Sequence, residues 1–194
     1  MRPVIALAAC ALVALAACKE EEIARPDPVA MTDETVGYYC QMYVMDHPGP
    51  KGQIFVKGFD APFWFSQVTD ARAFVLDPER EGEVLAIYVS DMGAAESWAI
   101  PGENNWIPVE TAYYVIESTQ LGGMGTPEAI SYASRADAEA LVAEVGGRVV
   151  GWEDLTDTYV RPDFDQTGSD EHAQADEHAH DAGANPGQIA EANQ

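Results

Sequence analysis

The chain has 194 residues, of which 47% are hydrophobic and 22% charged; this suits one globular domain or two very small ones and excludes disorder throughout. Acidic residues number 33 against 10 lysines and arginines, a formal net charge of -23 at pH 7. Such a surface repels phosphate backbones, so it argues against nucleic-acid binding and acidic substrates and favours cations and basic partners.

Residues 1–17 are predicted to be a signal peptide. An apolar run, Val4–Ala17, follows Arg2 and is shorter than the ~20 residues that a membrane-spanning helix needs. It ends in small residues directly before Cys18 and resembles a bacterial lipobox. Cleavage before Cys18 and acylation of its thiol are therefore predicted, with an ordinary cleaved signal as the alternative. The acyl chains would anchor the protein without spanning the bilayer.

Two neighbouring features refine this anchor. Cys10 also follows Leu-Ala-Ala, but the apolar run before it is too short for a signal peptide. Lys19 follows Cys18 and favours the outer membrane, because lipoprotein sorting retains chains with aspartate at that position in the inner membrane. Residues 18–35 contain Glu20-Glu21-Glu22 and two prolines, and are predicted to form a charged tether from the membrane to the domain.

Cys40 is then a lone thiol, since Cys10 leaves with the signal and Cys18 is acylated. Met42 lies two residues beyond it, so in an extended segment both side chains would point to one face. A thiolate with a thioether makes a soft ligand pair that suits Cu(I). A buried structural cysteine beside a core methionine explains the same residues. His47 is a further candidate, although Pro48 turns the chain after it.

An internal repeat predicts an α+β fold with two small ββαβ modules packed together, residues 36–98 and 99–160. Each contains two apolar strand-like segments, a helix that begins after a serine, and a β-rich run after a glycine. In the first, these lie at 53–56, 62–65, 70–75 (after Ser66) and 84–89. In the second, they lie at 112–116, 129–132, 137–142 (after Ser134) and 148–152. Coincidence between two Ala-rich helices is the alternative.

Two methionines beyond the Cys40 segment could also be ligands. Met124 has a glycine on each side, which is typical of a loop where the backbone comes close to another group. It is therefore predicted to reach toward another site as a ligand. Met92 follows the strand at 84–89, and core or loop packing is the simpler prediction for it.

The final segment, residues 161–194, has almost no large apolar side chain and is predicted to be a disordered acidic tail. His172, His178 and His180 lie there among acidic residues and form a possible weak divalent-metal tract. A solvating tail with incidental histidines is the alternative.

Catalytic motifs are absent from the sequence, which has no G-x-S-x-G, H-E-x-x-H, P-loop or C-x-x-C pattern. A Cys40–His47 pair is disfavoured as a nucleophilic dyad by its closeness in sequence and by the turn at Pro48. We therefore expect a protein that is not an enzyme.

Four strings in chain order resemble the NosL family of nitrous oxide reductase accessory lipoproteins. They are Cys40–Lys51, Trp64–Ser66, Ile87–Gly93 and Gly123–Ala129. The resemblance implies a Cu(I) chaperone that faces the periplasm and delivers copper to nitrous oxide reductase, with an ABC-type membrane complex handling transfer. It also implies two ββαβ modules, similar to part of organomercurial lyase.

Carried over by residue, Cys40 matches the thiol of the family, Met42 its partner thioether, and Met124 the methionine of the second module. Gln41 stands where many relatives would have glycine, and the histidine-bearing tail is not part of the family pattern. Two alternatives stay open: a lyase that cleaves an organometal through Cys40, which would want a second thiol, and a structural subunit of a transporter. Stoichiometric Cu(I) binding separates the chaperone from both.

Overall fold

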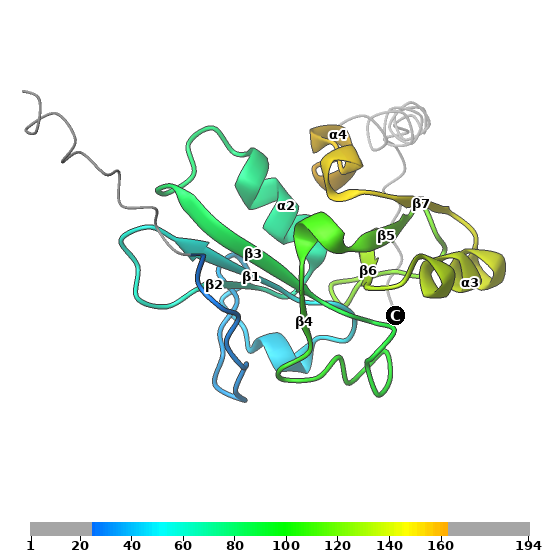
Figure 1. The fold of residues 1–194 in the computed structure, drawn as a ribbon, viewed down its shortest axis with the longest axis horizontal. Coiled ribbons are helices and arrows are strands. Elements are labelled where there is room, and N and C mark those ends of the chain that lie inside the picture. Colours follow the sequence, from blue (N-terminus) through cyan, green and yellow to red (C-terminus); the bar gives the residue numbers. More distant parts are fainter. Residues whose placement is uncertain (1–24, 163–194) are drawn as a thin grey trace, which may run out of the picture. The chain divides into compact units, whose positions relative to one another are not determined.

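The computed structural model describes residues 25–162, which fall into two compact units divided after Leu155. The first unit is an α+β fold with two antiparallel sheets, which confirms the predicted class (Figure 1). In the second, helix α4 (Asp157–Val160) is described. None of the described helices combines the length and hydropathy that crossing a bilayer requires. The predicted signal peptide, Cys18 and the three tail histidines lie outside the described residues.

The first sheet has four strands in the order β2-β1-β3-β4. The strands are β1 (Gly52–Val56), β2 (Phe63–Phe65), β3 (Val84–Ser90) and β4 (Trp106–Pro108). Helix α2 (Val68–Leu76) contacts β1 and β2 (Figure 1). The helix approaches β1 so closely that a Cβ on Gly52 would lie 2.8 Å from the Cβ of Ala71, so only glycine fits there without a shift.

Two details of this sheet differ from the sequence prediction. The N-cap of α2 is Gln67, without a side-chain hydrogen bond, rather than Ser66, whose hydroxyl is turned toward Cys40. The fourth strand was not predicted, because its three residues end in Pro108, and a proline argues against a strand except at the edge of a sheet, where β4 lies. Strand β4 lies beyond the boundary expected after residue 98, yet it pairs with β3.

The second sheet has the order β6-β5-β7 and is covered by one helix. Its elements are β5 (Tyr113–Ile116), β6 (Ile130–Tyr132), α3 (Arg135–Val145) and β7 (Arg148–Val150). Ser134 caps α3 as predicted, since its hydroxyl accepts a hydrogen bond from the Asp137 amide. The helix ends at Gly146, which has a φ of 74°. Ala138 on α3 is buried in a small core with Val115 and Ile130.

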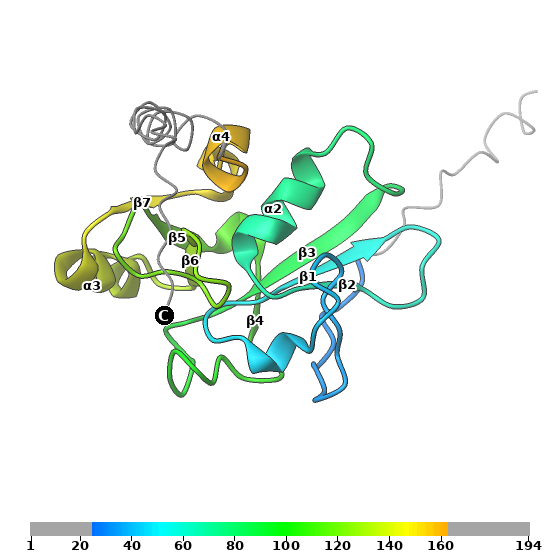
Figure 2. The ribbon, with the colours of Figure 1, turned by 180° about the vertical axis from the view of Figure 1, so that it is seen from behind.

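The end of β3 meets β6, and this contact joins the two sheets. The Ser131 hydroxyl donates to the Ser90 carbonyl at 2.6 Å, and the Met92 amide donates to the Ser131 carbonyl at 2.9 Å. The described part of the first unit, residues 25–155, also contains the single-turn 3-10 helices η2 (Val44–Asp46), η3 (Val109–Thr111) and η4 (Trp152–Asp154). Figure 2 shows η2 on the side of the β1–β3 sheet away from α2.

The segment from Arg25 to Met31 is attached to the first sheet, whereas the sequence suggested a tether as far as residue 35. The Gln53 side chain forms hydrogen bonds with both the amide and the carbonyl of Val29. The Arg25 guanidinium lies over the Tyr88 ring, and Met31 is buried. Residues 18–35 contain four glutamates and two prolines, and this long-range packing leaves no local pattern among them.

Candidate metal centre

Cys40 and Met42 are separated by a left-handed residue instead of sharing an extended segment. Gln41 has a φ of 55°, and its amide donates to the Gly37 carbonyl at 3.0 Å, which closes a tight turn. Its side-chain amide donates to the Tyr38 carbonyl at 2.7 Å and offsets part of the cost of this conformation. The extended backbone on which a shared face for Cys40 and Met42 would depend is therefore not present, and the φ value gives a reason why glycine suits this position.

The Cys40 thiol lies half-buried at the edge of the first sheet. Its Sγ is 3.4 Å from the Ser66 hydroxyl, which follows β2. A Cβ at residue 37 would lie 2.6 Å from the same sulfur, so Gly37 makes room for it. The Tyr38 amide donates to the Trp64 carbonyl, and the Tyr38 ring stacks on Phe63 with 4.6 Å between centroids. These contacts hold the turn and leave the thiol accessible from one side.

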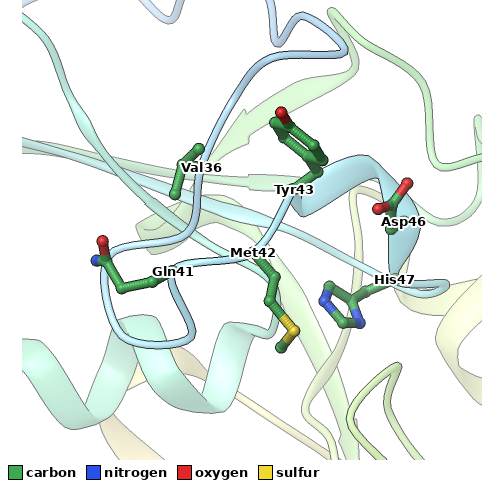
Figure 3. A pocket seen from close by; sticks show the side chains of 6 residues that line it. All are labelled: Val36, Gln41, Met42, Tyr43, Asp46 and His47. Carbon is green, nitrogen blue, oxygen red and sulfur yellow. The ribbon is translucent and has the colours of Figure 1, made fainter.

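Met42 and His47 line one pocket of about 450 Å³, next to this turn. Figure 3 shows the Met42 thioether and the His47 imidazole pointing toward the same part of the pocket, which is also lined by Val36, Gln41, Tyr43 and Asp46. Met42 is 43% exposed. The Nε2 atom of His47 is buried and has no hydrogen-bond partner among the described residues. Pro48 therefore does not aim the histidine away from the candidate ligands.

The loop that carries Met124 packs against the residues that follow this pocket. A Cβ on Gly123 would lie 2.4 Å from the Pro48 carbonyl oxygen and 2.9 Å from the Cβ of His47. The loop is closed by hydrogen bonds from the Gly122 amide to Thr126 and from the Gly125 amide to Gly122. Met124 itself is 38% exposed. The structure thus brings the second methionine loop to the His47–Pro48 segment, although Cys40 and Met124 are not among the residues that line the pocket.

A buried ammonium and a buried carboxyl group lie beneath these loops. Lys51 precedes β1 and is 0% exposed; burial lowers its pKa to about 8, although the charges of Glu128 and Cys40 oppose this. Glu128 follows the Met124 loop, and burial raises its pKa to about 8 despite hydrogen bonds from the Ala129 and Thr69 amides. Sequence reasoning missed both residues, because neither lies in a pattern that predicts a buried charge.

Met92 is not among the residues that line the pocket, and it packs against the core of Val115, Ile130 and Ala138. Core packing was the simpler prediction for it. Among residues 25–162, no group of three or more histidine, cysteine, aspartate or glutamate side chains is placed to hold a metal ion.

Comparison with known proteins identifies the family. The sequence model of NosL matches residues 28–160. The chain belongs to the NosL family. It is 48% identical over 168 residues to the copper-binding lipoprotein NosL of Achromobacter cycloclastes, covering 86% of each protein. It is 32% identical to the copper-binding lipoprotein NosL of Stutzerimonas stutzeri, covering 86% of this chain and 85% of that protein.

A solved NosL structure supports the fold. The crystal structure of the copper chaperone NosL from Shewanella denitrificans superposes with a TM-score of 0.63 at 31% identity, covering 67% of this chain and 96% of that one. The NosL match ends at residue 160, so His172, His178 and His180 lie beyond it.

Deleting residues 162–194 is expected to leave the fold and tight Cu(I) binding unchanged. The deleted segment offers imidazole and carboxylate groups, which bind Cu(I) less well than thiolate and thioether groups do. Far-ultraviolet circular dichroism and a Cu(I) competition titration of the truncated chain check this. Loss of the tight site on truncation would place the tail in the primary metal centre.

Proposed function

We propose that this chain is a lipid-anchored, periplasm-facing chaperone that carries Cu(I) for the maturation of nitrous oxide reductase, with Cys40, Met42 and Met124 as the metal ligands. Membership of the NosL family supports copper handling, since both relatives are named copper-binding lipoproteins. The observation that supports the ligand assignment is the close approach of Gly123 to His47 and Pro48, since His47 lines the same pocket as Met42.

The chemistry of these groups fits transfer rather than storage. One thiolate with two thioethers neutralises the charge of Cu(I) and gives a low coordination number. An incoming methionine or cysteine of an acceptor can then bind before the donor releases the ion. The exposure of Met42 and Met124 leaves that approach open. His47 is a further candidate ligand, because its buried Nε2 lacks a hydrogen-bond partner among the described residues.

The acidic surface suits both the capture of the copper ion and the later docking on an acceptor. A net charge of -23 attracts cations and favours docking on a basic partner. We propose that nitrous oxide reductase and an ABC-type membrane complex are the partners. The acylated Cys18 would hold the chain at the outer membrane.

A Cu(I) titration of the domain against a strong chromophoric chelator tests the proposal. We expect one tightly bound Cu(I) per chain, with Cu(II) and Zn(II) bound more weakly because they prefer harder ligands. Absence of tight stoichiometric Cu(I) binding would favour a structural subunit instead. Release of metal from an organomercurial would favour the lyase, which wants a second thiol, whereas Cys40 is the free cysteine found in residues 25–162.

Replacing Cys18 with serine is expected to release the protein from membranes, because serine cannot carry the thioether-linked lipid. Fractionation of cells into membrane and soluble parts measures this. Cys10→Ser is the matched control and should leave the protein in the membrane fraction, since Cys10 follows too short an apolar run. Retention of the Cys18→Ser chain in membranes would refute the lipobox.

A further inference from the structure

The fully buried Lys51 ammonium lies where the segments of the metal centre meet. Its Nζ donates to three backbone carbonyls: Gly49 at 2.7 Å, Pro48 at 3.2 Å and Ser66 at 3.3 Å. These acceptors belong to two segments that are separate in sequence, the turn after His47 and the residue after β2. One side chain therefore cross-links them.

Two of the three carbonyls that Lys51 binds, those of Ser66 and Pro48, belong to residues that contact a candidate copper ligand or its loop. Ser66 places its hydroxyl 3.4 Å from the Cys40 Sγ. Gly123, next to Met124 in the same loop, packs against Pro48. Pro48 also follows His47, which shares the pocket with Met42. The thiol and the second thioether are thus supported from the same buried group.

The position of Lys51 is not explained by stability alone. Taking an ammonium out of water is costly, and an apolar side chain of similar volume often replaces a buried charge without loss of stability. Neighbouring charges do favour the ammonium, since both Glu128 and Cys40 attract it. Glu128 follows the Met124 loop, and a Cβ on Gly122 of that loop would lie 3.0 Å from its carboxyl oxygen.

We propose that Lys51 is a positioning residue of the copper site: its ammonium holds the His47–Gly49 turn against Ser66, so that Cys40 and the Met124 loop stay within reach of one metal ion. The inference rests on the proposed function, because it assigns Lys51 a role in arranging those ligands. Residues that orient metal ligands without contacting the metal usually contribute about 10–100-fold to metal affinity.

Lys51→Leu tests the proposal, because leucine fills much of the volume, removes the charge and the three hydrogen bonds, and adds no sulfur that could bind copper. We expect a Cu(I) affinity about 10–100-fold below wild type, and fewer sulfur neighbours around copper by X-ray absorption. Lys57→Leu is the matched control: Lys57 lies on the surface, paired with Glu83, and its loss should leave both measurements at the wild-type value.

The outcomes separate this inference from the function on which it rests. If wild type binds no Cu(I), the proposed function fails. If wild type binds Cu(I) and Lys51→Leu binds it equally, the positioning role is refuted. A lower affinity with an unchanged sulfur count would also refute it, because the missing charge alone would then account for the loss.

A second variant covers the case in which Lys51→Leu does not fold because the buried Glu128 carboxyl group has lost its cationic neighbour. The double variant Lys51→Leu, Glu128→Gln replaces both titratable groups. We expect it to melt cooperatively and to show the same loss of affinity and of sulfur neighbours. Wild-type affinity in the folded double variant would overturn the proposal.

Discussion

Replacing Cys40 with alanine is expected to abolish tight Cu(I) binding. A thiolate carries a full negative charge and binds Cu(I) far more strongly than a neutral thioether. The loss of affinity should therefore exceed the loss of about 10–100-fold that follows removal of a residue that only orients a metal ligand. Competition against a Cu(I) chelator measures the affinity. A Cys40→Ala chain that binds one Cu(I) as tightly as wild type would remove the thiol from the site.

Methionine variants provide the matched series for this result. Met42→Leu and Met124→Leu keep the side-chain volume and lose the thioether, so each should weaken Cu(I) binding without abolishing it. Met92→Leu is the control, because Met92 packs in the core beside Val115 and should bind no metal. Nitrous oxide reduction in cells short of copper should follow the same order. Equal losses in all three variants would point to a fold defect instead.

The elements of the fold were largely predictable because they rest on local patterns. The strands and helices of both sheets follow apolar runs, and Ser134 caps its helix as expected. Ser66 occupies the equivalent position in the sequence, but its hydroxyl points to Cys40 instead of capping the helix. A contact between two segments that are distant in sequence determines this orientation. Strand β4 ends in a proline, which argues against a strand in the sequence, so its pairing with β3 comes from tertiary structure.

The ligand types of the site were predictable, but their arrangement was not. Soft sulfur groups and the glycines around Met124 pointed to a metal loop. The left-handed φ of Gln41 and the support of the Met124 loop on Pro48 depend on backbone geometry that no residue pattern displays. The burial of Lys51 was hidden for a related reason: lysine at the start of a strand is ordinarily exposed.

Replacing Gly123 with alanine is expected to weaken Cu(I) binding about 10–100-fold while the chain still folds. The added Cβ would lie 2.4 Å from the Pro48 carbonyl oxygen, a distance at which the loop or the turn must shift. Overpacking of this kind costs about 1–3 kcal/mol, and each 1.4 kcal/mol is tenfold in affinity. The strain should fall on the metal site, because Met124 adjoins the displaced residue and is exposed rather than held in the core.

Gly151→Ala is the matched control for this change. Gly151 has a φ of -92°, and the nearest contact of its added Cβ would be an ordinary 3.5 Å to the Asp154 carboxylate. It should therefore bind Cu(I) like wild type. Combining Gly123→Ala with Met124→Leu separates two explanations. If the loop acts by presenting the thioether, the second change adds little to the first. Full additivity of the two losses would mean that Gly123 supports the fold and that Met124 acts independently of it.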